Sequence, residues 1–317
     1  MLDQMTNPLG RMPEHFSASR LERQVTTDAL RIGYEESGPA KGTPIVLLHG
    51  FPDDVRAWDG VVATLTEHGY RTIVPYLRGF GPTRFLTADA PRSGQQAALG
   101  HDLLALLDAL EIDRAILAGY DWGGRAACIV SALWPERVEG LVSIGGYSIQ
   151  DIAKSGTPAA PESEQRGWYK WYFNTERGRA GLAHYRREFC RLLWKLWSPN
   201  MTSDDETFER TARSFENPDF VDIVVHSYRH RQGAARGDPA LDAIDARLST
   251  RPPVGVPTVL LHGGADGVDP AEGTKDHERF FLGPYERNVV PGAGHFLPRE
   301  APAEVVAAIR RLHDRKA

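Results

Sequence analysis

The stretch Ala118–Gly124, with the sequence Ala-Gly-Tyr-Asp-Trp-Gly-Gly, constrains the fold more than any other part of the chain. It follows a short apolar run at 114–117 and precedes a small, apolar segment at 125–133 with helical spacing. Gly119 and Gly123 would let a strand and a helix approach closely at a sharp turn, and the residue at its tip would then point outward. We therefore predict an elbow that presents Asp121, although these residues alone also fit an ordinary strand-to-helix turn.

Short apolar runs and amphipathic segments alternate along much of the chain. The expected strands span 24–27, 30–34, 44–48, 71–75, 114–117, 138–144, 258–262 and 287–290, and the expected helices span 55–68, 95–110, 125–133, 270–281 and 301–313. Such alternation predicts parallel strands joined by crossover helices on both faces of the sheet. We therefore expect an α/β fold with a mostly parallel central sheet flanked by helices.

The alternation stops between 148 and 240, where aromatic and charged residues dominate and no clear strand pattern remains. Such a segment is expected to form helices whose aromatic side chains pack together, with some of them facing the sheet. It follows the sixth predicted strand and ends before the alternation returns at 258–262. We therefore expect a core domain formed by 1–147 and 241–317, and a helical cap domain formed by 148–240.

Composition excludes several classes of function. The chain has 317 residues, of which 41% are hydrophobic and 25% charged, so it can bury a full core. Its formal net charge is −5 and no basic block stands out, which argues against a nucleic-acid partner. Residues 1–16 lack an apolar core of signal-peptide length, and no apolar run could span a bilayer. We expect a cytoplasmic enzyme without a membrane partner, either a monomer or a homodimer.

The cysteines and histidines do not form a metal-binding pattern. Cys128 and Cys190 lie in apolar and aromatic helical segments, so buried free thiols are expected, with a structural disulfide as the alternative. His226 and His230 stand four residues apart, but no carboxylate or third ligand lies at a suitable offset. The sequence therefore predicts no metal and no cofactor.

Three titratable residues follow the predicted ends of strands. In open α/β sheets, ligands bind at the carboxyl ends of the strands. Asp121, Asp266 and His295 could meet there in the chain order nucleophile, acid and base. Asp266 lies nearer its strand end than Asp269, which precedes Pro270 and is typical of a helix N-cap. We therefore predict that Asp266 orients His295, with Asp269 as the alternative.

Backbone amides near this point could stabilise negative charge. Phe51 lies in the loop His49–Asp53, which follows a predicted buried strand, and Trp122 directly follows Asp121. Pro52 has no N–H and cannot act as a donor. We predict that the backbone N–H groups of Phe51 and Trp122 form an oxyanion hole.

An aspartate at the elbow narrows the chemistry. Aspartate, with an ordinary pKa of about 3.9, is ionised at neutral pH, whereas the serine found at many such elbows must first lose a proton. Asp121 can therefore displace a leaving group at an sp³ carbon to form an ester, which water activated by His295 then hydrolyses. This chemistry suits the opening of a strained ether, with tyrosine hydroxyls as proton donors, or the release of a halide, with tryptophan N–H groups as donors.

Four short motifs form one set: Gly-Tyr-Asp-Trp-Gly at 119–123, His-Gly-Phe-Pro at 49–52, Gly-x-x-Asp ending at Asp266, and Gly-His ending at His295. This set resembles the α/β-hydrolase superfamily and, within it, the epoxide hydrolases, whose elbow has histidine where this chain has Tyr120. The resemblance covers residues 22 to 313. It implies an α/β-hydrolase fold and a hydrolase that acts on the ether bond of a small epoxide.

The resemblance also implies two cap tyrosines that polarise the epoxide oxygen. Tyr169, which lies 48 residues after Asp121, matches the first of them. Tyr228 precedes an arginine, as the second does in the family. Tyr172 and Tyr185 are interpreted as aromatic residues of the core or of its rim. Further substrate contacts are expected from His49, Pro52, Trp171 and Tyr172.

Other functions stay open. Haloalkane dehalogenases share Asp-Trp-Gly and bind halide through tryptophan N–H groups, a role that Trp122 and Trp171 could fill. Fluoroacetate dehalogenases carry Asp-Arg-x-x-Arg, whose two arginines bind a carboxylate, and this chain has only the second of them, Arg125. We expect Arg125 to form a structural salt bridge, with a carboxylated substrate as the alternative. A non-catalytic receptor or scaffold is the third possibility, although the complete set of Asp121, Asp266 and His295 argues against it.

Overall fold

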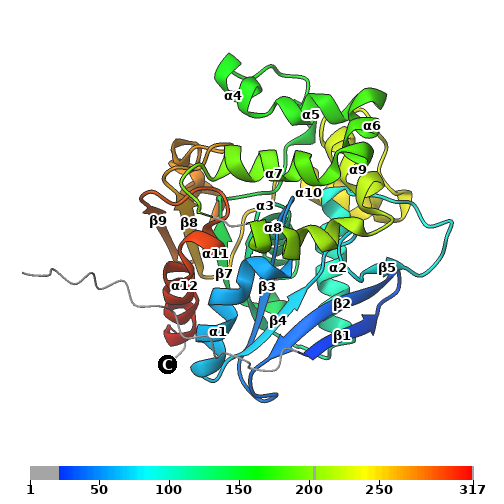
Figure 1. Cartoon of the computed structure of the whole chain (residues 1–317). Coiled ribbons are helices and arrows are strands. Elements are labelled where there is room, and N and C mark those ends of the chain that lie inside the picture. The colour runs from blue at the N-terminus through cyan, green and yellow to red at the C-terminus, as the bar shows by residue number, and fades with distance from the viewer. Residues whose placement is uncertain (1–20, 203–204, 316–317) are drawn as a thin grey trace, which may run out of the picture.

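A twisted, mostly parallel sheet forms the centre of the computed structural model, which describes residues 21–202 and 205–315 (Figure 1). Within these residues, nine strands pair in the order β1-β2-β4-β3-β6-β7-β8-β9, and β5 pairs with β2. The strands are β1 (Leu21–Thr26), β2 (Leu30–Ser37), β3 (Pro44–Leu48), β4 (Arg71–Pro75), β5 (Arg84–Phe85), β6 (Ala115–Tyr120), β7 (Val138–Ile144), β8 (Thr258–Gly263) and β9 (Tyr285–Val290). The prediction of an α/β fold with a mostly parallel sheet is confirmed.

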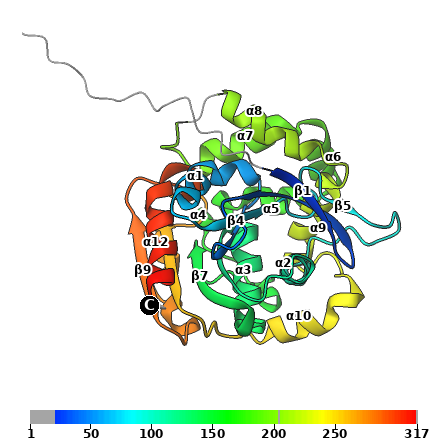
Figure 2. The ribbon, with the colours of Figure 1, turned by 90° about the horizontal axis from the view of Figure 1, so that it is seen from below.

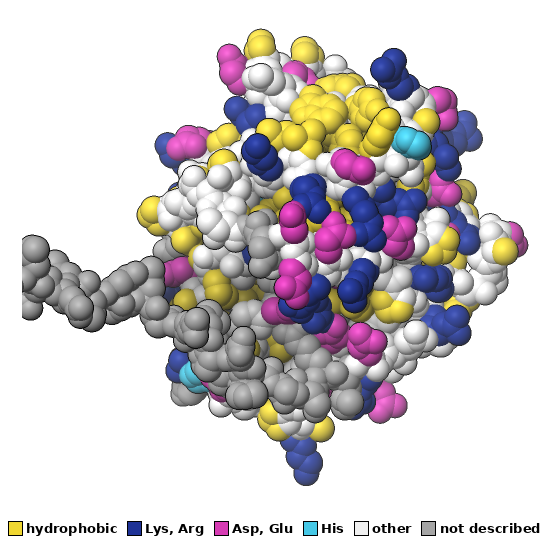
Figure 3. Space-filling model, viewed as in Figure 1, with side chains coloured by type: hydrophobic (Ala, Val, Ile, Leu, Met, Phe, Trp, Pro, Cys, Tyr) yellow, Lys and Arg dark blue, Asp and Glu magenta, His cyan; other side chains and the backbone are white. Residues whose placement is uncertain are grey.

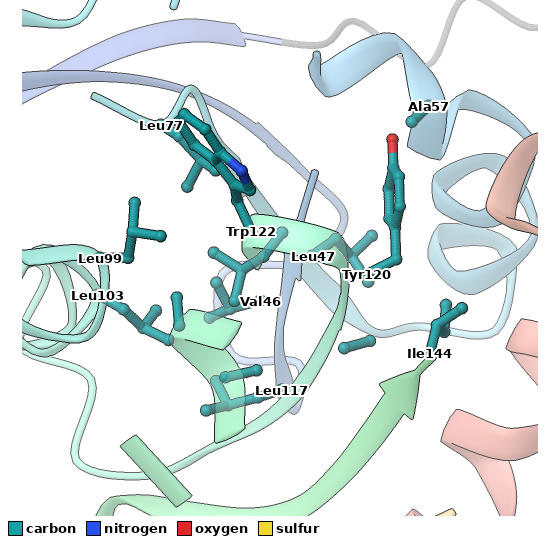
Figure 4. Packing of buried hydrophobic residues seen from close by; sticks show 14 of the residues in the cluster. Val46, Leu47, Ala57, Leu77, Leu99, Leu103, Leu117, Tyr120, Trp122 and Ile144 are labelled. Carbon is teal, nitrogen blue, oxygen red and sulfur yellow. The ribbon is translucent and has the colours of Figure 1, made fainter. Parts of the chain in front are cut away.

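The central strands are buried because their sequences are apolar on both faces. Every residue of β6 and β8 is buried, and β6 runs parallel to β3 and β7 on either side. Only the edge formed by β1, β2 and β5 is antiparallel. Figure 4 shows how Leu47 of β3 and Leu117 of β6 pack beneath the chain that follows β6. The carboxyl ends of the central parallel strands therefore meet at one edge of the sheet.

Helices cover both faces of the sheet. Helix α1 (Asp59–Glu67) packs against α12 (Pro302–Asp314), and α2 (Gln96–Ala109) packs against α3 (Asp121–Leu133), with the two pairs on opposite faces (Figure 2). Among the strands, β6 and β7 have the most extensive contacts with α3. This arrangement fixes the start of α3 at the carboxyl edge of the sheet.

The segment between β7 and β8 is helical and lies over that edge (Figure 1). Its helices are α4 (Pro161–Arg166), α5 (Trp168–Phe173), α6 (Glu176–His184), α7 (Arg186–Trp197), α8 (Asp205–Ala212), α9 (Phe220–Arg231) and α10 (Asp242–Ser249). Phe51 of the sheet edge packs against Phe173, Phe220 and Tyr228 of these helices. One apolar core therefore runs from the sheet into the helical segment, and the division into two domains at 148 and 240 stays a prediction.

Three local elements differ from the sequence prediction. The expected helix 55–68 is split into a 3₁₀ turn (Val55–Trp58) and α1, and the expected helix 270–281 is two 3₁₀ turns (Ala271–Thr274 and His277–Phe280). The carbonyl of Ala271 accepts hydrogen bonds from the side chains of Thr274 and Arg287, which substitute for the amide of a continuing helix. Strand β5 has only two residues, too few to show a period, so the helical segment follows the seventh strand rather than the sixth.

The distribution of surface charge and the state of the two cysteines match what the sequence predicts. Basic and acidic side chains are interspersed on the face shown in Figure 3. Arg187 and Arg191 of α7 both pair with Glu209 of α8. Cys128 and Cys190 are free and buried, as expected. Within residues 21–202 and 205–315, no helix is both long and apolar enough to cross a bilayer, and no group of three potential metal ligands is found.

Candidate active site

The elbow forms where β6 runs directly into α3. Asp121 is the first residue of the helix and has φ of 49°, in the left-handed region that side chains with a Cβ rarely adopt. The turn needs glycine at its flanks, because a Cβ at Gly123 would lie 2.2 Å from the Leu48 carbonyl oxygen and one at Gly119 would lie 2.5 Å from that of Gly123. Trp122 points into the core (Figure 4). The strained backbone therefore holds the Asp121 carboxylate above the sheet edge.

The loop after β3 brings one amide donor to Asp121. The Phe51 N–H donates a hydrogen bond to Asp121 Oδ1 at 2.8 Å. His49 supports this loop from within the core: its Nε2 accepts from the Leu77 N–H at 3.1 Å, and its Nδ1 lies 3.0 Å from the Gly50 carbonyl oxygen. Burial lowers the pKa of His49 to about 4, so its ring is neutral and Nδ1 carries the proton. His49 therefore fixes the backbone, and it does not line the cavity described below.

His295 and Asp266 form a buried pair across the loops that follow β8 and β9. His295 Nδ1 lies 2.9 Å from Asp266 Oδ2, and because a carboxylate only accepts, Nδ1 carries the hydrogen. Asp266 Oδ1 accepts from the backbone N–H groups of Val268 and Asp269, both at 2.9 Å, which fixes the carboxylate. His295 Nε2 is buried and has no hydrogen-bond partner among the described residues. The structure thus pairs His295 with Asp266 rather than with the side chain of Asp269.

Nearby charges hold a proton on His295. Burial alone would lower the pKa of His295, but the Asp266 carboxylate, helped by Asp121 and Asp269, raises it to about 9. Part of that increase depends on the negative charge of Asp121. Any reaction that neutralises Asp121 would therefore lower the pKa of His295 and make it a better base.

A cavity of about 310 Å³ joins these groups. Its lining includes Asp121, Asp266 and His295 from the sheet edge and Tyr169 from α5. Its remaining ionisable lining residues are Arg125, Lys170, Arg231, His262, Asp269 and His277. A molecule of modest size could thus touch the elbow carboxylate, the histidine and a phenol at once.

The two tyrosines lie side by side on α5 and α9. Tyr169 and Tyr228 are buried, with ring centroids 5.3 Å apart and planes at 90°. Tyr228 packs beside the cavity rather than in its lining, and its hydroxyl has no hydrogen-bond partner among the described residues. Burial is the main cause that raises the pKa of Tyr228 well above its ordinary value, and the negative charge of Asp121 adds to it. The pKa of Tyr169 is raised in the same way, by burial first and by the neighbouring Tyr228 second. Both phenols therefore stay protonated and can donate.

Like His49, three further residues expected to contact a substrate do not line the cavity. Trp171 is 47% exposed, and its indole N–H donates to Glu164 at 2.7 Å. Tyr172 stacks on Phe189 with ring centroids 5.9 Å apart. Pro52 is buried beneath the helical segment, where its carbonyl accepts from the Trp194 indole at 2.7 Å. The structure therefore does not support a role for Trp171 as a second halide donor.

Arg125 also differs from expectation. Its side chain is buried and lines the cavity, and no carboxylate of the described residues lies within salt-bridge distance of it. Its Nε has no hydrogen-bond partner among the same residues. The expected structural salt bridge is thus absent from this part of the chain, and Arg125 instead faces the cavity together with Lys170 and Arg231.

Sequence reasoning missed a buried polar cluster behind the elbow. The Tyr120 hydroxyl donates to Asp53 Oδ2 at 2.7 Å, and Arg299 Nε donates to the same oxygen at 2.8 Å. These residues belong to the elbow, to the Phe51 loop and to α11 (Leu297–Glu300), which follows His295. The cluster therefore connects the three segments that carry the site. Its members stand next to the predicted motifs in the sequence, and this placement could have identified them.

Replacing Tyr120 by phenylalanine should reduce the free energy of unfolding by about 1–3 kcal/mol, because Asp53 would lose a buried donor. Chemical denaturation measures this change. Tyr185→Phe is the matched control, since Tyr185 is exposed and should tolerate the change. Equal stability of the two variants would show that the Tyr120 hydroxyl does not hold the cluster together.

Comparison with known proteins finds relatives of the α/β-hydrolase type. A family model described as the alpha/beta hydrolase fold matches residues 43–302. Epoxide hydrolase A of Mycobacterium tuberculosis is 24% identical over 313 residues, covering 91% of this chain and 95% of that protein. The AB hydrolase superfamily protein YfhM of Bacillus subtilis is 31% identical and covers 71% of this chain and 78% of its own. A Klebsiella pneumoniae crystal structure, described as that of a candidate epoxide hydrolase, has a TM-score of 0.90 and 42% identity, covering 92% of this chain and 96% of its own.

Proposed function

Because the chain belongs to the α/β-hydrolase fold family, we propose that it is an epoxide hydrolase that converts an epoxide and water to a vicinal diol through an ester on Asp121. One observation carries the proposal: a strained elbow holds a carboxylate in the same cavity as the His295–Asp266 pair and a buried phenol. The relatives named epoxide hydrolases support it. Serine-type ester hydrolysis fits the cavity less well, since its nucleophile would be a carboxylate.

In the first step, Asp121 attacks a carbon of the epoxide. Oδ1 accepts from the Phe51 N–H, which leaves Oδ2 to form the new C–O bond. The C–O bond of the epoxide breaks, and its oxygen takes a proton from the hydroxyl of Tyr169 or Tyr228. The product is a hydroxyalkyl ester of Asp121 and one phenolate. Esterification lowers the pKa of His295, so His295 gives up its Nε2 proton, which returns to the phenolate and leaves a neutral imidazole for the second step.

In the second step, water hydrolyses the ester. His295 Nε2 takes a proton from water, and the hydroxide attacks the carbonyl carbon of Asp121. The Phe51 N–H already contacts Oδ1, and the Trp122 N–H lies in the first turn of α3, where amides lack helical partners. Both could hold the oxyanion that forms. The ester C–O bond then breaks, the diol oxygen takes the proton from His295, and Asp121 is free again.

Two measurements test the proposal. Aliphatic and aryl epoxides are incubated with the protein, and the diol is measured by mass spectrometry. A single turnover in H₂¹⁸O should place the heavy oxygen in the side chain of Asp121, because the second step breaks the acyl bond. A panel without any diol, or a diol that carries the label while Asp121 stays unlabelled, would contradict the mechanism.

Replacing Tyr228 by phenylalanine should slow epoxide opening by about 100-fold or more, because the leaving alkoxide loses a proton donor. The same change should matter little for halide release, which needs no proton. Measuring kcat for an epoxide and for a haloalkane therefore separates the two chemistries. Tyr185→Phe is again the control. A Tyr228→Phe variant with unchanged epoxide turnover would remove Tyr228 from the mechanism.

A dehalogenase is the second candidate, and one observation favours it. The Trp122 indole N–H is buried beside the Tyr228 hydroxyl, without a hydrogen bond of regular geometry among the described residues, and it could donate to a halide that reaches past the cavity lining. The exposed position of Trp171 removes the second donor of the sequence-based hypothesis. Halide release from haloalkanes is the direct measurement.

A further inference from the structure

Three basic side chains line the cavity that contains Asp121. Arg125 comes from α3, Lys170 from α5 and Arg231 from the end of α9, so elements far apart in the sequence bring them together. Within residues 21–202 and 205–315, none of the three has a carboxylate within the 4.0 Å of a salt bridge. Arg125 is only 6% exposed and its Nε has no hydrogen-bond partner there. A buried, unpaired guanidinium costs free energy unless something else binds it.

A neutral amide holds two of these cations side by side. With the Gln150 amide oriented so that its oxygen faces the guanidinium groups, the oxygen accepts from Arg231 Nε and Nη2, both at 2.6 Å, and from Arg125 Nη2 at 3.3 Å. Burial and the charge of Arg231 lower the pKa of Arg125 to about 10. Gln150 thus orients the two guanidinium groups without neutralising either.

The acidic residues of the cavity have other partners or change charge in the reaction. Asp266 is paired with His295. Burial raises the pKa of Asp269, but the charges of Lys170, His295 and Arg231 outweigh it and lower that pKa. Asp121 becomes a neutral ester in the first step of the proposed reaction. From that moment Asp269 is a remaining anion that acts on Arg125 and Arg231, and among the described residues it lies beyond salt-bridge distance of both.

We propose that the substrate is an epoxide that carries a carboxylate close to the ring, and that Arg125 and Arg231 bind this carboxylate while Asp121 attacks the adjacent carbon. Arg125 lies one helical turn after Asp121 on α3, and both side chains line the same cavity. The carboxylate therefore lies within a few bonds of the attacked carbon, as in an oxirane carboxylate. Guanidinium groups bind carboxylates through paired N–H donors, which also orients the ring. This inference depends on the proposed function.

The test compares a charged with a neutral substrate of the same shape. The probes are 3-phenyloxirane-2-carboxylate and its carboxamide, and the readout is the ratio of their kcat/KM values, in which any general loss of activity cancels. The intact protein should prefer the carboxylate by about 10- to 100-fold, and Arg125→Gln and Arg231→Gln should each reduce this ratio by about tenfold or more. Arg177→Gln, a change on the exposed surface of α6, should keep the ratio.

A binding measurement separates failure of this inference from failure of the proposed function. The unreactive 3-phenylpropanoate should bind the intact protein in calorimetric titration, and binding should weaken about tenfold in Arg125→Gln and in Arg231→Gln. Turnover of both epoxides without a preference for the carboxylate overturns the inference and leaves epoxide hydrolysis intact. Binding of 3-phenylpropanoate without turnover of any epoxide overturns the proposed function instead. If 3-phenylpropanoate does not bind, or binds equally well to the intact protein and to both arginine variants, the proposed carboxylate site is wrong.

Discussion

Asp121→Ala is expected to reduce kcat/KM for any epoxide substrate by at least about 10⁴-fold, because the variant lacks the group that bonds to carbon. Among the carboxylates that line the cavity, Asp266 is held by His295 and two backbone amides, so it is not free to replace Asp121. Initial rates of diol formation at several epoxide concentrations give the loss. Incubation of the variant with substrate should also leave its intact mass unchanged.

The control for this variant addresses folding and charge. Asp242→Asn removes one negative charge at the exposed start of α10 and should keep full activity. Alanine at φ of 49° is strained, so the thermal unfolding of Asp121→Ala must be measured beside it. A folded Asp121→Ala variant that keeps a tenth of the activity would show that water attacks the epoxide directly.

The residues that follow strand ends were predictable, because the topology of a parallel sheet brings those ends to one edge. Asp121, Asp266 and His295 each follow a recognisable apolar strand, and the structure brings all three to one cavity. Short elements were not predictable in the same way: β5 has two residues, and side-chain hydrogen bonds decide the 3₁₀ turns near Ala271.

The error at Trp171 has a simple geometric origin. Tyr169 and Phe173 stand four residues apart on α5 and are both buried, so they share the inward face of the helix. Trp171 stands between them on the opposite face and is exposed. Applying the helical period to this segment would have separated Tyr169 from Trp171 without a structure.

The positions of the cationic side chains in the cavity could not be predicted from the sequence. The chain has 37 lysine and arginine residues, and nothing in the local sequence of Lys170 or Arg231 distinguishes them from the others. Only the packing of α5 and α9 over the sheet edge brings them near Arg125. Positions that depend on contacts between distant helices need the fold, whereas positions that follow a strand end need only the pattern.

His295→Gln is expected to separate the two steps of the reaction. The first step does not use His295 as a base, so Asp121 should still be alkylated, whereas ester hydrolysis should slow by about 10³- to 10⁴-fold. Intact-mass spectrometry after brief exposure to an epoxide should therefore show one covalent adduct, and peptide mapping should place it on Asp121. In the unmodified protein the same adduct would be too short-lived to accumulate.

The charges around His295 explain why it acts as a base only after the ester has formed. The charge of Asp121 contributes to the raised pKa of His295, so esterification lowers that pKa and releases a base when water must be activated. Glutamine has no such basic nitrogen, although it can still donate to Asp266. Asp266→Asn should also accumulate the ester, because it removes the carboxylate that orients the ring. If His295→Gln forms no adduct but still loses diol formation, His295 acts before the ester forms, and the order of steps proposed for this cavity is wrong.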